Sequence, residues 1–304
     1  MLNKLANGIW VVAPDKPPRY PYANCMYIEG ERSIVIDIGA GARAFADIPV
    51  NEIAKVLISH FHFDHIHGAQ LFTRAGLYAG REEKETYSCK EAYISFHGYD
   101  LWEELMPGID REAYGKVMPL GDDVLAQPGF RPLTLAGTFR DGTVFDTGRT
   151  TVRAVHLPGH TRGHYGFYID KENILFSGDI DLAATGPWYS SSSADVGQLI
   201  ASVKLIQEIN PSILVTSHRR IFTAGIISGL DNYIGIVLAR HERILNLLKE
   251  PMTLHQLSAY KLVFPDRRNT YELFWEKMTI RNHLHYLLAA ELIVEIEKGV
   301  FLRK

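Results

Sequence analysis

Short apolar runs separated by turn-forming residues make up most of the first 218 positions of the chain. Runs of this kind that are rich in β-branched residues are typical of strands. The pattern predicts strands at residues 9–13, 24–29, 33–38, 56–58, 76–80, 138–140, 143–145, 151–155, 174–176 and 212–216. An amphipathic helix is predicted at residues 195–209, and Asn210-Pro211 ends it.

Residues 81–137 interrupt this strand pattern. Their first part, up to Met106, has a helical composition and many aromatic side chains, whereas Pro107-Gly108 and Pro128-Gly129 break the rest of the segment. The last third of the chain favours helices again and ends in two short apolar runs, which are typical of a hairpin. The helices are predicted at residues 230–250, 254–262 and 271–290, and the hairpin strands at 292–296 and 300–302.

Composition narrows the class of protein but does not name its chemistry. The 304 residues suffice for one large domain or two, and 46% hydrophobic with 22% charged residues is ordinary for a soluble globular protein. A net charge of −3 gives no electrostatic reason to expect nucleic acid or an anionic membrane. Cys25 and Cys89 are too few for a disulfide framework. With no signal-peptide core and no apolar run of about 18 residues, we expect a cytoplasmic protein.

The densest group of chemically active side chains is Ser59–Gly68, directly after the predicted strand at 56–58. His60 and His62, two positions apart in extended chain, project to the same side. Asp64 and His65 come next in the turn and can point at a second, adjacent position. Imidazoles with a carboxylate suit zinc, iron or manganese better than calcium. The alternative is a solvated loop with adventitious metal affinity.

The spacing His-x-His-x-Asp-His resembles the signature of the metallo-β-lactamase fold hydrolases, and further matches occur in that family's order. Residues 158–164 resemble its Pro-Gly-His-Thr-x-Gly-His element, Ser177-Gly178-Asp179 its bridging aspartate, and Ser217-His218 its last ligand. Together these matches cover about residues 8–220. The resemblance implies an α+β fold, a four-layer αβ/βα metallo-β-lactamase sandwich. We interpret residues 81–137, which depart from the strand pattern, as a helical cap inserted over the site.

The resemblance also implies a ligand set. His60, His62 and His160 would hold one metal ion, Asp64, His65 and His218 a second, and Asp179 would lie between them. Asp179 and Asp64 are the candidate catalytic residues, and the expected cofactors are two divalent ions, zinc first, with iron or manganese as alternatives. Three imidazoles leave one position of a tetrahedral zinc open, which is typical of catalytic sites, whereas a closed structural site is the alternative.

Residues outside the ligand set have more open roles. Asp37 either supports the ligand loops by accepting backbone N–H bonds or caps a turn. His164 is expected beside the ligands rather than among them, and His97 is expected to pack or to lie at the surface. Trp188 and Tyr189 either contact substrate or anchor their loop.

The function expected from this site is dinuclear metal-dependent hydrolysis, in which a metal-bridging hydroxide attacks a small carbonyl substrate such as a thioester, lactone or ester. One alternative is a ribonuclease or phosphodiesterase of the same fold, although too few residues separate Asp179 from His218 for the domain that larger nucleases insert there. Others are a mononuclear iron oxidoreductase of the persulfide type and a metal-bearing binding protein.

The domain organisation predicted is a catalytic domain at residues 1–228, with its cap, and a C-terminal module at 229–304. Helices before a terminal hairpin resemble the winged-helix appendage of some family members. Basic residues of the module are matched by acidic ones, so no basic face stands out. We therefore expect packing, pocket closure or homodimer formation rather than DNA binding, and a small-molecule substrate as the partner, without nucleic acid or membrane.

Overall fold

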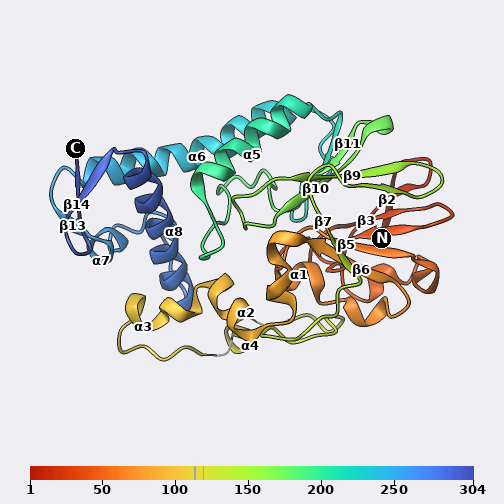
Figure 1. Ribbon diagram of the computed structural model, residues 1–304, viewed down its shortest axis with the longest axis horizontal. Coiled ribbons are helices and arrows are strands. Elements are labelled where there is room, and N and C mark those ends of the chain that lie inside the picture. Colours follow the sequence, from red (N-terminus) through yellow and green to blue (C-terminus); the bar gives the residue numbers. More distant parts are fainter. Residues whose placement is uncertain (113, 119) are drawn as a thin grey trace.

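Two β-sheets packed face to face form the centre of the protein in this computed structural model, which describes residues 1–112, 114–118 and 120–304 (Figure 1). The first sheet has the order β1-β2-β3-β4-β5-β6-β7 and the second β12-β11-β10-β9-β8. The strands of the first sheet are β1 Leu2–Ala6, β2 Ile9–Val12, β3 Cys25–Ile28, β4 Ile34–Ile36, β5 Lys55–Ile58, β6 Gly76–Gly80 and β7 Gly137–Phe139. Those of the second are β8 Val144–Asp146, β9 Thr151–His156, β10 Tyr165–Ile169, β11 Ile174–Phe176 and β12 Ile213–Val215.

Burial separates the core into layers. Side chains such as Ile9, Met26 and Phe167 fill the space between the sheets. The outer face of the second sheet is covered by α5 (Val196–Ile209) and α6 (Ile226–Leu247), whose Leu199 and Val237 share a core with that face. Short helices and loops cover the outer face of the first sheet. The predicted four-layer sandwich is confirmed.

The helices on the outer side of the first sheet and in the cap are short. They are η1 Arg43–Phe45, η2 Val50–Glu52, α1 Phe63–Ile66, η3 Ala69–Leu71, η4 Arg81–Tyr87, α2 Lys90–His97, η5 Tyr99–Leu101, α3 Trp102–Leu105 and α4 Tyr114–Val117, with η6 Asp170–Glu172 in the second sheet's loop. The helical composition of 81–106 therefore does not give a long helix. Gly98, at φ +74°, ends α2 in a left-handed conformation that glycine adopts readily. Residues 113 and 119 of the predicted cap lie outside the described residues.

The turn at Asp141-Gly142 links strands of different sheets. β7 pairs with β6 in the first sheet, whereas β8 pairs with β9 in the second, so this turn carries the chain between sheets. β1 and β10 were not predicted as separate strands. The expected position of Asp179 and His218 at strand ends is found. β11 and β12 run parallel, so their carboxyl ends lie at the same edge of the sheet, and Asp179 and His218 follow these ends.

The C-terminal elements are α6, β13 (Met252–Thr253), α7 (Leu254–Ser258), α8 (Thr270–Ala289), β14 (Ile293–Glu297) and β15 (Val300–Arg303). The helices and the terminal hairpin are present as predicted, and the hairpin joins β13 in a three-stranded sheet. The likeness to a winged helix and the division at 228/229, which falls in the first turn of α6, stay predictions. Among the described residues, no helix combines the length and apolarity needed to cross a membrane.

α8 extends from the C-terminal sheet toward the cap (Figure 1). Its Tyr271, Phe274 and Met278 share a buried apolar cluster with Trp102 and Met106 of the cap. The cap and the C-terminal elements therefore have a common core beside the site.

Candidate metal centre

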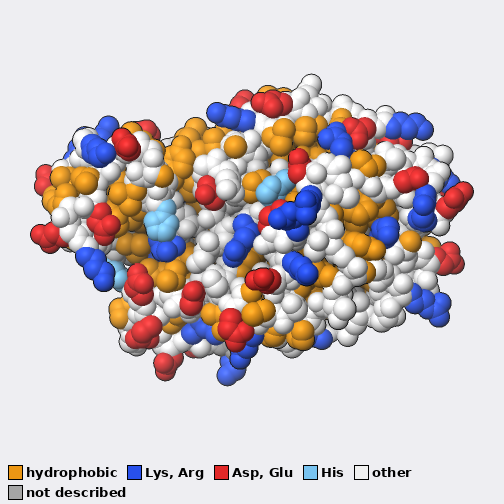
Figure 2. Space-filling view, in the orientation of Figure 1, with side chains coloured by type: hydrophobic (Ala, Val, Ile, Leu, Met, Phe, Trp, Pro, Cys, Tyr) orange, Lys and Arg blue, Asp and Glu red, His pale blue; other side chains and the backbone are white. Residues whose placement is uncertain are grey.

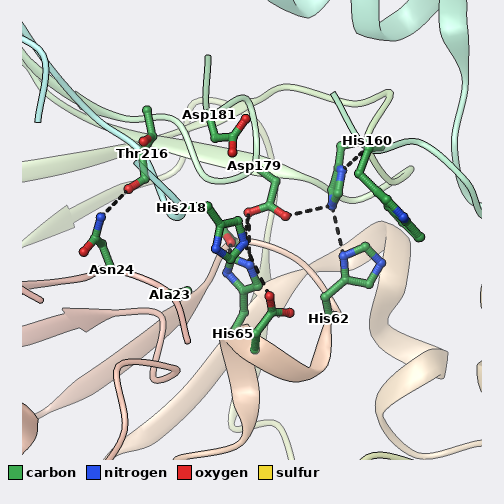
Figure 3. A network of polar contacts seen from close by, with 12 residues as sticks. Ala23, Asn24, His62, His65, His160, Asp179, Asp181, Thr216 and His218 are labelled. Carbon is green, nitrogen blue, oxygen red and sulfur yellow. Dashed lines mark hydrogen bonds and ion pairs between the residues drawn. The ribbon is translucent and has the colours of Figure 1, made fainter. Parts of the chain in front are cut away.

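All seven predicted ligand side chains converge at one end of the sandwich, where loops after β5, β9, β11 and β12 meet. Figure 3 labels His62, His65, His160, Asp179 and His218 of this set. Their donor atoms form two groups, each with all its atoms within 4.8 Å of one another. The first group contains His60, His62, His160 and Asp179, and the second Asp64, His65 and His218. The two sets match the division that the resemblance implied.

Local backbone geometry explains how residues distant in sequence reach this place. After β5 the chain turns into α1, which brings Asp64 and His65 together with His218 in the second group. Before His160, Gly159 adopts φ +126°, and a Cβ there would lie 2.2 Å from the backbone nitrogen of Leu199. Only glycine fits this turn, which brings His160 back over the sheet edge.

Three imidazole nitrogens of the first group meet in a tight triangle. His60 Nε2 lies 2.9 Å from His62 Nδ1 and 3.1 Å from His160 Nε2, and the third side is 2.9 Å. Asp179 spans the two groups, because its Oδ2 lies 3.3 Å from His160 Nε2 and its Oδ1 3.1 Å from His65 Nε2. His218 Nε2 lies 3.3 Å from both Asp64 Oδ2 and Asp179 Oδ1.

Hydrogen bonds on the far side of three rings, those of His60, His65 and His160, fix where their protons lie. The Ser59 hydroxyl donates to Asp37 at 2.7 Å, so it accepts from His60 Nδ1 at 3.0 Å. His160 Nδ1 donates to the Trp188 carbonyl at 2.7 Å, and His65 Nδ1 donates to Asp37 Oδ2 at 2.7 Å. Each of these rings, in its neutral form, therefore turns an Nε2 lone pair into the site.

Burial also favours the neutral form of the imidazoles in the first group. It lowers the pKa of His60 and of His62 well below the ordinary histidine value, and the neighbouring histidines lower both further. In the second group, burial opposes protonation of His218, but Asp179 and Asp64 raise its pKa to about 9. Burial would raise the pKa of Asp179, yet His218, His65 and His160 hold it well below its usual range.

These donors fit divalent metal ions. Lone pairs from neutral imidazoles that converge within 3.1 Å repel one another unless a cation lies among them. Nitrogen and carboxylate oxygen donors without cysteine match zinc, manganese or iron. Asp179, with one oxygen toward each group, has the geometry of a bridging carboxylate.

Asp37 has the supporting role suggested as one alternative. Besides His65 and the Ser59 hydroxyl, its carboxylate accepts the Ser59 backbone N–H at 2.7 Å. Asn24 supports the His218 strand end, because its side-chain amide donates to the carbonyls of Thr216 and Arg219 at 2.9 and 2.8 Å (Figure 3). Sequence reasoning did not identify Asn24.

Glu83 was also missed. It is 1% exposed and accepts the backbone N–H groups of Phe61 at 2.7 Å and Gly163 at 2.9 Å, so it ties the loop of His60 and His62 to the loop of His160. Burial raises the pKa of this carboxyl, although the bonds it accepts oppose the shift. Glu83 lies just after β6 in the cap sequence, and nothing in its local pattern indicated this role.

A cavity of about 560 Å³ opens over Asp64, Asp179 and His218. Its walls are mostly aromatic, with rings from Phe61, Phe63, Tyr93, His97, Tyr99, Trp188 and Trp275. Lys and Arg side chains gather near the middle of the face in Figure 2, and Arg19 and Arg219 line the cavity.

Three aromatic residues whose roles the sequence left open lie at or behind this wall. Trp188 lines the cavity and packs edge-on against His62, with ring centroids 5.2 Å apart. Tyr189 is buried and anchors the loop. His97 packs, as expected, but does so at the cavity wall, stacked between His62 and Tyr99, where burial lowers its pKa to about 3.

Comparisons with known proteins agree with this geometry. An atrochrysone carboxyl ACP thioesterase of Aspergillus fumigatus is 24% identical over 74% of this chain and 43% of its own length. An acyl-coenzyme A thioesterase of Gallus gallus is 29% identical over 52% of this chain and 57% of its own. The chain thus spans about half the length of these curated relatives.

Among solved structures, a metallo-beta-lactamase family protein of Thermus thermophilus superposes with a TM-score of 0.74 at 21% identity, covering 99% of this chain and all of that one. A beta-lactamase domain protein of Burkholderia ambifaria gives a TM-score of 0.67 at 18% identity, with 100% and 93% covered. The family profile described as the metallo-beta-lactamase superfamily matches residues 20–218. This match covers more than half of the chain, and the two sheets and the histidines at their strand ends agree with it. The chain therefore belongs to the metallo-beta-lactamase superfamily.

Proposed function

We propose that this chain is a metal-dependent hydrolase that holds two divalent ions, preferably zinc, and cleaves acyl thioesters. The observation that carries the proposal is the pair of donor groups joined by Asp179, with a cavity directly over them. Ligands would be His60, His62 and His160 in one group, Asp64, His65 and His218 in the other, and Asp179 in both.

Metal ions bound there would supply hydroxide from water at neutral pH and polarise a carbonyl oxygen. The chain's own residues do the rest. Asp179 keeps the two groups in register, and Asp64, which faces the cavity beside His218, accepts a hydrogen bond from the attacking water and orients it. The aromatic walls exclude bulk water around the acyl group.

The cavity supports a thioester with a bulky apolar acyl group as the substrate. Rings of the cap, the loop after β11 and α8 form its walls, and the two relatives above are named as thioesterases of acyl carriers. Arg19 and Arg219 line the same cavity, and guanidinium groups there suit the phosphates of such a carrier. In this proposal residues 1–228 carry the ligands and 229–304 close the pocket through Trp275.

The test combines metal analysis with a substrate screen. We expect purified protein to contain two equivalents of zinc and to release thiol from acyl-coenzyme A, with activity lost on exhaustive chelation and restored by zinc. Asp179→Asn should lower kcat/KM by at least about 100-fold. Asp231→Asn, at an exposed position on α6, should leave it unchanged.

Contrary outcomes are specific. Full turnover after chelation would contradict metal dependence. Cleavage of phosphodiesters but not of thioesters or lactones would favour the nuclease alternative, and one equivalent of iron with oxidation of persulfides would favour the oxidoreductase.

A further inference from the structure

In the loop between β11 and α5, Tyr189, Ser190 and Ser191 form hydrogen bonds with α8, and Trp188 comes directly before them. We call these four residues the 188–191 segment. Asn282 of α8 donates its side-chain amide to the carbonyls of Tyr189 and Ser191, both at 3.0 Å. Ser190 Oγ lies 2.7 Å from Thr279 Oγ1, one turn earlier on α8. The segment is therefore fixed at three consecutive residues by a single helix.

A buried polar cluster extends this contact. The Tyr189 hydroxyl lies 2.9 Å from His283 Nε2 and accepts a hydrogen bond from Arg240 of α6. His283, in turn, lies 3.2 Å from His241. All of these groups are buried, so the cluster exchanges few bonds with solvent and has few alternative arrangements.

The other side of the 188–191 segment holds the proposed metal ligands. The Trp188 carbonyl accepts the Nδ1 proton of His160 at 2.7 Å, and the Trp188 ring contacts the rings of His160 and His62. Trp275 of α8 packs edge-on against Trp188, with centroids 5.9 Å apart. A separate bond leads from α6 to the bridging residue, because the Tyr233 hydroxyl donates to the Asp179 carbonyl at 2.9 Å.

From this chain of contacts we infer that Asn282 and Thr279 of α8 are positioning residues for the metal ligand His160, acting through the 188–191 segment. The inference rests on the proposed function, since it takes His160 as a ligand. The partner of a ligand histidine's second nitrogen fixes the ring's tautomer and direction. Here that partner is the Trp188 carbonyl. The next residue, Tyr189, is held through its own carbonyl by the Asn282 amide, more than 90 positions away.

The role is one of alignment rather than general stability. Asn282 uses both of its amide hydrogens on carbonyls two residues apart, so it sets the curvature of the peptide that begins at Trp188. Leu284, on the same helix and equally buried, packs in the C-terminal core with Ile244 instead. Replacing Leu284 disturbs α8 without removing a bond to the segment, which makes it the matched control.

The experiment titrates metal-free full-length protein with Co²⁺ against a competing chelator and records the visible spectrum and the Tm. For the wild type we expect two equivalents to bind. Asn282→Ala should weaken one of the two equivalents by about 10–100-fold and shift its spectrum, because support beyond the ligands has this effect on metal affinity. Thr279→Val, which keeps its shape, should weaken the same equivalent by a smaller factor. Leu284→Ala should lower the Tm and leave both equivalents and the spectrum unchanged.

Each result decides a different point. Wild-type protein that binds no Co²⁺ contradicts the proposed function itself. Binding by wild-type protein with unchanged affinity and spectrum in both Asn282→Ala and Thr279→Val overturns the positioning role alone. Equal weakening in Leu284→Ala would also overturn it, since the effect would then track stability. Where Asn282→Ala fails to fold, Thr279→Val decides.

Discussion

The imidazole of His164 accepts the backbone N–H of Asp179 at 3.0 Å. Its other nitrogen donates to the Leu157 carbonyl at 2.9 Å, so both ring nitrogens are used and the ring joins the ends of β9 and β11. Burial lowers the pKa of His164 to about 3, which keeps the ring neutral and able to accept the bond. The second histidine of the Pro-Gly-His-Thr-x-Gly-His element therefore supports the Asp179 backbone, with both of its ring nitrogens engaged in hydrogen bonds.

Replacing His164 should loosen the Asp179 backbone without removing any of the proposed metal-binding atoms. We expect His164→Ala to lower kcat/KM by about 10–100-fold through weaker metal retention. His164→Gln can restore an acceptor and should recover part of the loss. Metal content after dialysis, measured beside activity, checks this. Full metal content and activity in His164→Ala would contradict the role.

Glu83 provides a second prediction. Glu83→Ala leaves the N–H groups of Phe61 and Gly163 buried without an acceptor, and we expect it to cost on the order of 3 kcal/mol in the free energy of unfolding. Glu83→Gln keeps one acceptor oxygen and should cost less. Urea unfolding of metal-free protein measures both. Glu85→Ala, at an exposed position of the same helix, is the control for the helix itself.

The buried His283 should make the free energy of unfolding depend on pH. Burial, together with His241 and Arg240, holds its pKa well below the ordinary value of 6.5. The unfolded chain therefore takes up a proton below pH 6.5 while the folded protein does not, and stability present above 6.5 is lost as the pH falls. His283→Gln should remove up to about 1.4 kcal/mol of this loss per pH unit. Parallel unfolding curves from pH 7 to 5 check it; identical slopes would refute it.

Arg19 tests recognition of the carrier. It is exposed, lines the cavity and lies away from the donor groups. Arg19→Ala should raise KM for acyl-coenzyme A about three- to tenfold, with kcat nearly unchanged, as expected for loss of a charge-assisted contact. The corresponding acyl thioester of N-acetylcysteamine, which lacks phosphate, is the control substrate. An equal rise in KM for both would contradict the assignment.

The sequence indicated the proposed ligands because each one comes after a strand in a short motif, and parallel strands bring such motifs to one edge. His60, Asp179 and His218 could be placed in this way, and the order of layers could be taken from the resemblance. Glu83 and Asn282 could not, because their roles depend on which backbone groups they meet 80 or more positions away. No local spacing encodes such a meeting.

Two features could not be read from local pattern. The helical composition of residues 81–106 does not show that the segment is divided into short helices, of which α2 ends at Gly98 in a left-handed conformation. The turn at Asp141-Gly142 likewise does not reveal which sheet the next strand joins, and β7 belongs to the first sheet whereas β8 belongs to the second. For Trp188 and Tyr189 the sequence left two roles open, substrate contact or loop anchoring. Trp188 lines the cavity, whereas Tyr189 is buried and anchors the loop.

The apolar cluster that Trp102 and Met106 share with Tyr271, Phe274 and Met278 has a consequence for redesign. A chimera that takes its cap from a relative with another acyl preference would leave these α8 side chains facing foreign partners. Exchange of the cap alone should therefore yield poorly assembled protein, whereas exchange of the cap with the matching face of α8 should transfer the preference intact.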